Sequence, residues 1–358
     1  MDFAGQCSSR RPSPSTAAQT GSHPAMPILV LLAAALLSAG LILVLRPLLL
    51  RYALARPNAR SSHRVPTPQG GGIAVIAAAL AATAAALAAG DSPRGEFALV
   101  AASSLILASI GAVDDLRPLP AGARLLVQIV AVAAVVTASG IRVLPDIVPL
   151  WLEQGLLVAA GVWFVNLVNF MDGLDWMTVA EMVPITAFVA LLGPLELLPL
   201  SVALAAAALC GGVLGFAPFN RPVAKLFLGD VGSLPIGLMV GWLLLHLAGT
   251  GALAAALLLP LYYLADATIT LLRRLARRER VWEAHRTHFY QQATDRGLSP
   301  LAVSARVFLL NLLLAALAAV TLVFREPAVQ VAALVAGMAL VGVMLLRFAR
   351  PRSRSALS

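Results

Sequence analysis

Long apolar stretches separated by short polar connections dominate this chain. Eleven of them run for about 16 to 22 residues, close to the length with which a helix crosses a hydrocarbon layer of roughly 30 Å. They fall near residues 27–45, 70–89, 97–113, 124–140, 155–171, 178–193, 199–217, 233–249, 252–272, 301–323 and 328–347. The stretches are continuous rather than alternating, and in lipid the backbone must satisfy its own hydrogen bonds. The pattern predicts an all-α, polytopic integral membrane protein with about eleven transmembrane helices.

The composition supports this fold class. Hydrophobic residues make up 60% of the 358 residues, charged residues only 12%, and the mean hydropathy is +0.88. An ordinary soluble domain carries roughly twice that charged fraction, so a water-soluble globule and a disordered chain are both excluded. The chain holds just two cysteines, Cys7 and Cys210, which excludes a disulfide-stapled scaffold.

The basic residues lie at the ends of the apolar stretches. If the connections alternate between the two sides of the membrane, one face receives twenty-one arginine and lysine residues and the other three. This asymmetry predicts that the first face, which includes the C-terminus, is cytoplasmic. The net charge of +9 therefore reports membrane topology, and no nucleic-acid partner is expected.

The chain is expected to form one polytopic domain over residues 26–350 with a tail at each end. Residues 1–25 are rich in Ser, Pro, Ala, Gln and Gly and predict a disordered tail, and residues 351–358 predict a short cytoplasmic tail. Arg10 and Arg11 conflict with the charge rule, and a translation start at Met26 would remove the conflict.

Five polar clusters share the cytoplasmic face, whereas a transporter concentrates its polar groups near the bilayer midplane. The first cluster, residues 57–72, is rich in Pro, Gly and Arg and alone would be explained by anchoring beside the membrane. The second contains Asp114 and Asp115 at the end of one stretch and Arg124 at the start of the next. Adjacent carboxylates repel each other unless a cation lies nearby, although a solvated helix end is the alternative.

The third cluster is the most informative because its polar residues recur at helical spacing. Asn166, Asn169, Asp172 and Asp175 follow one another at intervals of three and form one slanted stripe on an apolar helix end. Packing alone does not account for four polar side chains in such a place. This stripe therefore indicates a functional site at the membrane surface.

The last two clusters follow later stretches. Asp230 lies between two glycines that allow close backbone approach, and Lys225 precedes it. His285, Arg286 and His288 lie in a long basic connection whose arginines would also suit binding to anionic lipid. The histidines suit hydrogen bonding to phosphate. Asp266 is expected to be a structural partner of a nearby arginine.

Together, in this order, the strings GAVDDL, NLVNFMDGLD, FLGDVGS and HRTHFYQ closely resemble the polyprenyl-phosphate N-acetylhexosamine-1-phosphate transferase superfamily. The resemblance covers roughly residues 51–299 and is strongest to the WecA-like and WbpL-like branch, with TagO-like and MraY-like enzymes as relatives. It implies transfer of a sugar 1-phosphate from a UDP-activated N-acetylated amino sugar to undecaprenyl phosphate, giving polyprenyl-diphospho-sugar and UMP. It also implies a Mg²⁺ or Mn²⁺ cofactor and a place in the bacterial inner membrane, at the start of O-antigen or cell-envelope glycan synthesis.

The resemblance also implies roles for particular residues. Metal binding would fall to Asp230 and Asn169, and catalytic roles to the four remaining aspartates, Asp114, Asp115, Asp172 and Asp175. Substrate binding would involve Arg124, Asn166, Lys225, His285, Arg286 and His288. Whether Asp114 or Asp115 acts as a general base or positions the lipid phosphate is left open.

Two departures from the family pattern concern the finer substrate contacts. Gln69 occupies a position that is often basic, and Trp176 follows Asp175 where glycine is usual. Two other classes of protein stay open at this point, a secondary transporter or lipid flippase and an inactive membrane scaffold. The sequence does not identify the sugar, the downstream glycan or the oligomeric state, a homodimer included.

Overall fold

The computed structural model describes residues 25–55, 66–90, 94–280 and 285–350. The two predicted tails, except for Ala25, and much of the first polar cluster lie outside these residues. Within them the chain is almost entirely helical, and the fold class predicted from the apolar stretches is confirmed. The chain is a multi-pass membrane protein, because eight of its helices are long and apolar enough to cross a bilayer.

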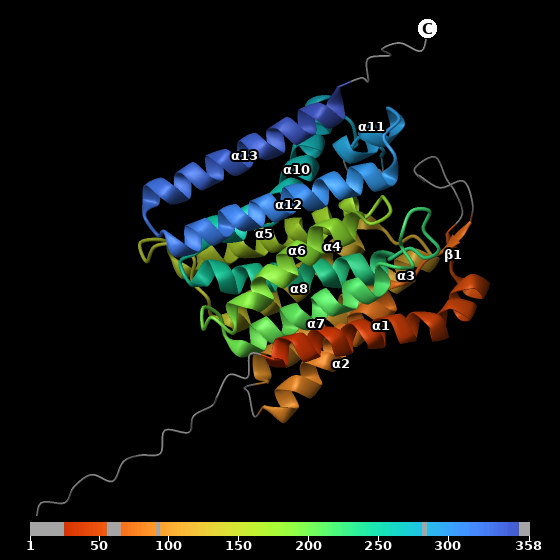
Figure 1. Ribbon diagram of the computed structural model, residues 1–358, viewed down its shortest axis with the longest axis horizontal. Helices are drawn as coiled ribbons and strands as arrows, with labels where there is room; N and C mark the ends of the chain where they lie inside the picture. The colour runs from red at the N-terminus through yellow and green to blue at the C-terminus, as the bar shows by residue number, and fades with distance from the viewer. Residues whose placement is uncertain (1–24, 56–65, 91–93, 281–284, 351–358) are drawn as a thin grey trace, which may run out of the picture.

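The elements follow one another along the chain with one short hairpin of strands near the start (Figure 1). The strands are β1 (Leu54–Ala55) and β2 (Thr67–Pro68). The helices are α1 (Ala25–Tyr52), α2 (Gly72–Ala89), α3 (Gly95–Leu116), α4 (Ala121–Ser139), α5 (Leu150–Met171), α6 (Met177–Leu192), α7 (Leu200–Phe216), α8 (Asp230–Gly249), α9 (Leu253–Leu258), α10 (Leu261–Ala276), α11 (Phe289–Asp295), α12 (Pro300–Val323) and α13 (Pro327–Ala349).

Each predicted stretch has a helical counterpart, but three differ from a simple span. Helices α6 and α7 have only 16 and 17 residues, shorter than the roughly 20 that a perpendicular crossing needs. The ninth stretch, near 252–272, is divided into α9 and α10, and Pro260 lies between them. Proline lacks an N–H group and cannot continue a regular helix, which explains the division.

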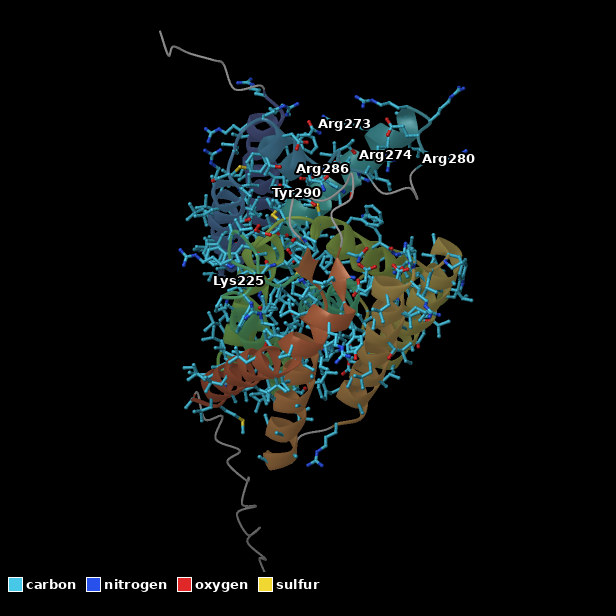
Figure 2. All side chains as sticks on the ribbon, turned by 90° about the vertical axis from the view of Figure 1, so that its right-hand side faces the viewer. Lys225, Arg273, Arg274, Arg280, Arg286 and Tyr290 are labelled. Carbon is cyan, nitrogen blue, oxygen red and sulfur yellow. The ribbon has the colours of Figure 1, made fainter. Side chains whose placement is uncertain are left out.

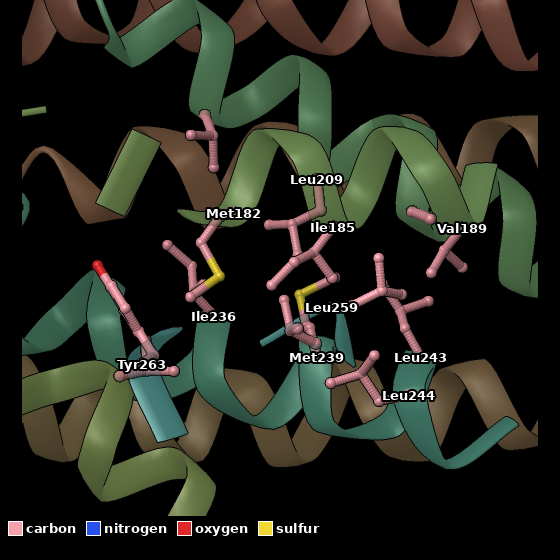
Figure 3. Packing of buried hydrophobic residues seen from close by; sticks show 14 of the residues in the cluster. Met182, Ile185, Val189, Leu209, Ile236, Met239, Leu243, Leu244, Leu259 and Tyr263 are labelled. Carbon is pink, nitrogen blue, oxygen red and sulfur yellow. The ribbon is translucent and has the colours of Figure 1, made fainter. Parts of the chain in front are cut away.

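Helix α8 lies at the centre of the bundle and α1 and α13 at its edges. Of the most apolar 18-residue window of α8, 83% is buried, against 22% for α1 and for α13. Figure 3 shows the packing around this centre, where side chains of α6 and α7 meet those of α8, such as Met182, Leu209 and Met239. Lipid-facing helices keep apolar side chains exposed, and this accounts for the low burial at the edges.

Small residues let α1 and α7 approach closely. A side chain on Gly211 would place its Cβ 2.1 Å from the carbonyl oxygen of Leu31, and one on Gly215 would lie 2.3 Å from that of Ala35. The Ser38 hydroxyl donates a hydrogen bond of 2.8 Å to the Gly212 carbonyl oxygen. Glycine spaced by four residues is a common means of close helix packing in membranes.

The hairpin joins the start of α2 to the start of α8. Strand β1 pairs with β2 in antiparallel fashion, and Gln69, just after β2, forms a bridge with Phe227. Gly72 then lies against Gly232, where an added Cβ would be 2.2 Å from the Gly232 Cα atom. The hairpin therefore lies over the turn that precedes Asp230.

The opposite end of the bundle is held by a different set of polar contacts. The buried Glu153 carboxylate accepts a hydrogen bond of 2.8 Å from Arg142 Nε and two more from the backbone N–H groups of Val143 and Leu144. These bonds fold the connection between α4 and α5 onto the start of α5. These hydrogen bonds stabilise the end of the bundle that carries few basic residues.

Gly211→Ala should destabilise the protein by about 1–3 kcal/mol, because the added methyl group overpacks the α1–α7 contact. The matched control is Gly342→Ala in α13, where no atom lies within 4 Å of the added Cβ and where alanine is the better helix former. Thermal unfolding in detergent measures both. Equal midpoints for the two variants would contradict the close packing.

Candidate active site

The predicted polar residues gather at one end of the bundle, which we call the site end. There α3 and α5 end, and α4 and α8 begin. Gly111 allows α3 to lie against the first turn of α8, since an added Cβ would be 2.4 Å from the Asp230 carbonyl oxygen. This approach brings carboxylates from helices far apart in the sequence to one place.

The two predicted metal ligands are in contact. Asn169 Nδ2 donates a hydrogen bond of 2.7 Å to Asp230 Oδ1 and lies 2.9 Å from the Ser233 hydroxyl oxygen. Asn169 comes from the last turn of α5, whereas Asp230 and Ser233 lie in the first turn of α8. The N-terminus of a helix favours negative charge, so it suits both Asp230 and an anionic ligand.

Arg124 connects two of the carboxylates. Its guanidinium forms an ion pair with Asp114 Oδ2 and lies 3.5 Å from Asp230 Oδ2. The other Asp114 oxygen, Oδ1, accepts a hydrogen bond of 2.6 Å from the Leu119 N–H group. Asp114 thus contacts both the connection between α3 and α4 and the guanidinium of Arg124.

Asp115 has a different environment from its neighbour. Its carboxylate oxygens accept hydrogen bonds of 3.0 and 3.1 Å from the backbone N–H groups of Asp230 and Val231. It therefore caps the N-terminus of α8 from another helix. Gln69 adds a hydrogen bond of 2.7 Å to the Asp115 carbonyl oxygen. This residue, at the position that the family often makes basic, here supports the cap.

Asp172 lies immediately after α5 and accepts a hydrogen bond from the Thr178 hydroxyl. Burial, together with the negative carboxylates of Asp230, Asp115 and Asp175, raises the pKa of Asp172 to about 8. The group is therefore protonated at pH 7 unless a cation lies beside it. A site that crowds carboxylates in this way favours binding of positive charge.

Asp175 lies beneath the loop that leads to α8. Only 2% of it is exposed, and its carboxylate accepts a hydrogen bond of 3.0 Å from the Ala224 N–H group. The Asp175 carbonyl oxygen accepts a bond of 2.6 Å from the Ser304 hydroxyl on α12. In this structure Asp175 positions the loop between α7 and α8.

Trp176 adopts a left-handed backbone conformation, with φ of 61° and ψ of 6°. Glycine reaches this region without steric cost, which explains in physical terms why glycine is usual there in the family. Two hydrogen bonds hold the tryptophan in place, from its N–H group to Asn220 Oδ1 at 2.8 Å and from Nε1 to the Ala217 carbonyl oxygen at 2.6 Å.

Asn166 and Lys225 make no direct contact with the Asn169–Asp230 pair in the hydrogen bonds of the described residues. Asn166 Nδ2 donates to Gln128 Oε1 of α4 at 2.6 Å and to the Val162 carbonyl oxygen at 2.8 Å. The exposed Lys225 lies in the loop before α8. Figure 2, which views the site end, shows its label away from the arginines of the upper part.

The predicted histidines are joined to Asp266 rather than to the carboxylates of the site. The buried Asp266 accepts hydrogen bonds of 3.0 and 3.3 Å from the N–H groups of Phe289 and Tyr290, and His288 Nδ1 lies 3.2 Å away. The predicted arginine partner of Asp266 was therefore wrong. Its partners among the described residues are His288, the first N–H groups of α11, and the hydroxyls of Tyr262 and Thr270 on α10, and these donors would otherwise be buried without an acceptor.

His285 stacks on His288, with 4.8 Å between ring centroids. Burial and the neighbouring charges of His288 and Arg274 lower the pKa of His285 to about 4, so its ring is neutral at pH 7. Nδ1 lies 2.9 Å from the Thr287 hydroxyl. If Nδ1 accepts this hydrogen bond, the proton lies on Nε2, which can donate to an anion.

Tyr290 connects α11 to the end of α5. Its ring stacks on His288, and its hydroxyl donates a hydrogen bond of 3.3 Å to the Phe170 carbonyl oxygen. Gly173 leaves room for that hydroxyl, which would lie 2.3 Å from an added Cβ. The basic motif at residues 285–290 is therefore joined to the end of α5 by Tyr290 and to α10 by the contact of His288 with Asp266.

A basic cavity of about 280 Å³ opens next to this motif. Arg286 lies in it and forms an ion pair of 2.7 Å with Asp295, and Arg273 packs over the Phe289 ring at 4.6 Å. The lining residues are Thr270, Arg273, Arg274, Arg277, Arg286, Thr287 and Gln292. Figure 2 labels three of these arginines close to Tyr290. Guanidinium groups in such numbers suit phosphate oxygens.

A second cavity, of about 230 Å³, lies inside the bundle between α4, α5, α8, α9 and α10. Apolar side chains such as Val132, Leu157, Phe164 and Leu264 line it. Val165, also in its lining, directly precedes Asn166 on α5. An apolar chain could therefore lie within about two turns of the polar groups of the site.

Four residues of the site were not singled out in the sequence as members of it. Thr178, Ser233 and Gln69 are short or neutral side chains that contact Asp172, Asn169 and Asp115 respectively, and Tyr290 reaches the end of α5. Thr178 follows Asp172 by six residues, but the turn between them removes the helical spacing that would have revealed the pair. Their position in the sequence near the carboxylates of the motifs was the one signal that could have indicated a place in the site.

Comparisons with known proteins find one family model and several relatives. Residues 97–248 match the model of glycosyl transferase family 4. A probable undecaprenyl-phosphate N-acetylglucosaminyl 1-phosphate transferase of Bacillus subtilis is 25% identical over 279 residues, which cover 72% of this chain and 75% of the relative. A decaprenyl-phosphate N-acetylglucosaminephosphotransferase of Mycolicibacterium smegmatis is 34% identical over 223 residues, 55% of this chain and 54% of the relative.

A third relative belongs to another branch. The phospho-N-acetylmuramoyl-pentapeptide-transferase of Symbiobacterium thermophilum is 37% identical over 206 residues, which cover 51% of this chain and 61% of the relative. The chain thus spans three quarters of the Bacillus relative and less than two thirds of the other two. These matches confirm the family resemblance predicted from the motifs, and none of these three relatives is a transporter.

Trp176→Gly should be more stable than Trp176→Ala by roughly 0.5–1 kcal/mol, because both lose the indole but only alanine keeps the left-handed strain. Unfolding of the two variants in detergent measures the difference. Greater stability of the alanine variant would contradict the strained conformation at this position.

Proposed function

Because residues 97–248 match the model of glycosyl transferase family 4, we propose that the chain transfers an N-acetylhexosamine 1-phosphate from a UDP-sugar to a polyprenyl phosphate. An oxygen of the lipid phosphate forms a bond to the sugar-bearing phosphorus. The bond from that phosphorus to the bridging oxygen breaks, and UMP leaves. The product is a polyprenyl-diphospho-sugar, and the sugar is an N-acetylated amino sugar in this proposal.

The proposal rests above all on the contact between Asn169 and Asp230, at 2.7 Å, with Arg124 3.5 Å from the same aspartate. A phosphate monoester carries about −1.5 to −2 charge at pH 7, and the diphosphate that it attacks is also anionic. Two unit charges of the same sign at 4 Å repel each other by roughly 4 kcal/mol at an effective dielectric constant of 20. The site must therefore supply positive charge before the substrates meet.

The donor set fits a divalent metal ion such as Mg²⁺. Asp230 and Ser233 offer oxygen atoms at one place, the ligand type that Mg²⁺ prefers, and Asn169, whose Nδ2 donates to both, would add its amide oxygen after a rotation of the side-chain amide. Within the described part of the chain, no three His, Cys, Asp or Glu residues form a complete metal site. This suits Mg²⁺, which is usually held by one or two carboxylates together with substrate phosphates and water. When bound, the ion would neutralise the diphosphate and the leaving UMP.

The other residues would bind and position the substrates. Arg124 offers planar donors to a phosphate oxygen and is itself held by Asp114. Asp115 keeps the first turn of α8, and with it Asp230, in place. Asp172, protonated or beside a cation, can contact the nucleotide sugar, while Asp175 holds the loop above it.

The ion pair of Asp114 favours a positioning role over general base catalysis. Both carboxylate oxygens of Asp114 already accept contacts, Oδ2 from the Arg124 guanidinium and Oδ1 from the Leu119 N–H group, so neither is turned toward an incoming proton. The nucleophile also needs little help, because its second pKa lies near 6 and most of it is deprotonated at pH 7. Asp114 therefore serves mainly to orient Arg124.

Two cavities suit the two substrates. The apolar cavity beside Val165 would take part of the polyprenyl chain, and the arginine cavity around Arg286 would attract the anionic nucleotide. His285, neutral at pH 7, would donate a hydrogen bond there. His288 would stabilise this arrangement through its contact with Asp266. The role of Lys225 and of Asn166 is indirect in this scheme, through the loop before α8 and through Gln128.

In this proposal the site end faces the cytoplasm, where nucleotide sugars are made. The excess of arginine at that end follows the positive-inside rule. The membrane is then the bacterial inner membrane, with the C-terminus in the cytoplasm. Labelled UDP-sugars incubated with membranes and polyprenyl phosphate test the activity, because an inactive scaffold or a transporter makes neither labelled lipid nor UMP.

Asp230→Asn should reduce transfer by at least about 100-fold and weaken binding of Mn²⁺, used as a spectroscopic probe of the site. Electron paramagnetic resonance measures free Mn²⁺ independently of activity. Asp146→Asn, at the opposite end of the bundle, is the matched control. Wild-type transfer across a magnesium titration by the Asp230 variant would reject the metal assignment.

Asp114→Asn should slow transfer by a similar factor at pH 6 and at pH 8, since an orienting role does not depend on the protonation of the nucleophile. A general base would behave differently, with a severe loss at pH 6 and little loss at pH 8, where the lipid phosphate is already ionised. The ratio of variant to wild-type rate at the two pH values distinguishes these roles.

A further inference from the structure

A separate basic cavity lies where α11, α12 and α13 meet, outside the proposed transferase site. Its volume is about 250 Å³. Four arginines line it, Arg296 after α11, Arg306 on α12, and Arg347 and Arg350 at the end of α13. It shares no lining residue with the basic cavity around Arg286.

The floor of this cavity is rigid. Arg296 Nη1 donates a hydrogen bond of 2.7 Å to the Phe348 carbonyl oxygen, which ties the residue after α11 to the last turn of α13. Phe348 is only 1% exposed and packs edge-on against Tyr262 of α10, with 6.5 Å between ring centroids. The other three arginines are exposed around this fixed floor.

Arg306, Arg347 and Arg350 lie together without an ion-pair partner in the described part of the chain. Among residues 25–55, 66–90, 94–280 and 285–350, none of the ion pairs involves Arg306, Arg347 or Arg350. Guanidinium groups that line a common cavity repel one another unless an anion lies between them. A phosphate group is the anion that several arginines bind best, because its oxygens match their planar donors.

The apolar surroundings indicate where that phosphate comes from. Along α12 and α13, the side chains next to the arginines are exposed and apolar, with Leu309 60%, Val343 48% and Leu346 57% exposed. Leu309 follows Arg306 by three residues and Val343 precedes Arg347 by four, so each pair shares a helix face. A charged pocket at the end of two lipid-facing helices suits a lipid headgroup whose acyl chains run along them.

We propose that this cavity binds the phosphate of an anionic phospholipid. The headgroup phosphate lies among Arg306, Arg347 and Arg350, and its acyl chains contact the exposed faces of α12 and α13. The site is distinct from the place where polyprenyl phosphate would react, and it does not depend on the proposed transferase activity.

Native mass spectrometry of the purified full chain tests the proposal. The protein, released from a nonionic detergent, is titrated with phosphatidylglycerol or, in parallel, with phosphatidylcholine. We expect tight binding of the first phosphatidylglycerol molecule and weakening on the order of tenfold in the double variant Arg306→Gln/Arg347→Gln. The matched control, Arg51→Gln/Arg221→Gln, removes two exposed arginines elsewhere and should bind like wild type.

Three results would overturn the proposal. Equal weakening in both double variants would mean that total charge, not this cavity, attracts the lipid. Equal binding of phosphatidylcholine would remove the role of the anion. Displacement of phosphatidylglycerol by millimolar inorganic phosphate would assign the cavity to free phosphate instead of lipid.

A charge-retaining variant separates binding from folding. Arg306→Lys/Arg347→Lys should bind more weakly than wild type but more tightly than the glutamine variant, since lysine keeps the positive charge at the lipid surface and loses the planar donors. Circular dichroism of all variants verifies that the helices are retained. Affinity of the lysine variant as low as that of the glutamine variant, with the helices retained, would also overturn the proposal.

Discussion

The site depends on the contact between the end of α3 and the first turn of α8. Asp115 accepts the N–H groups of Asp230 and Val231, and Gly111 lets the two backbones approach closely enough for these bonds. Within an apolar bundle, unsatisfied N–H groups at a helix start would be costly. The Asp115 carboxylate therefore accepts hydrogen bonds from the N–H groups at the start of α8. It also holds the neighbouring carboxylate, Asp230, within reach of Asn169. The remaining polar residues are arranged around this junction.

Crowded carboxylates and surrounding arginines serve opposite purposes at the site end. Asp115, Asp172 and Asp230 create a region that favours a cation, while Arg124 and the arginines near α11 favour anions. A reaction between two phosphates requires both, because the substrates are attracted by arginine and their mutual repulsion is relieved by positive charge at the point of contact. The carboxylates lie near the start of α8 and most of the arginines near α11, and Tyr290 connects the two regions.

The sequence predicted those features that follow from spacing. Apolar lengths located the long helices but not the short α11 or the division of the ninth stretch into α9 and α10, and Asn169 was placed beside Asp230 by the motifs and found there. Asn166, on the same predicted stripe, turns instead to Gln128, because neighbouring helices decide which partner a buried amide meets. The contacts of Asp266 with α11 could not be predicted either, since His288 and the N–H groups of Phe289 and Tyr290 arrive from a later turn. The left-handed Trp176 depends on Asn220 and Ala217, which no local pattern connects to it.

Ser304 gives the outer helices an influence on the chemistry. Its hydroxyl holds the backbone of Asp175, whose carboxylate in turn holds Ala224, and from Ala224 the chain continues within six residues to Asp230. Movement of α12 relative to its neighbours would therefore pull on the turn that presents Asp230. Sequence changes in α12, away from the Asn169–Asp230 pair, would alter turnover in this way, so family members could diverge in rate without any change in that pair.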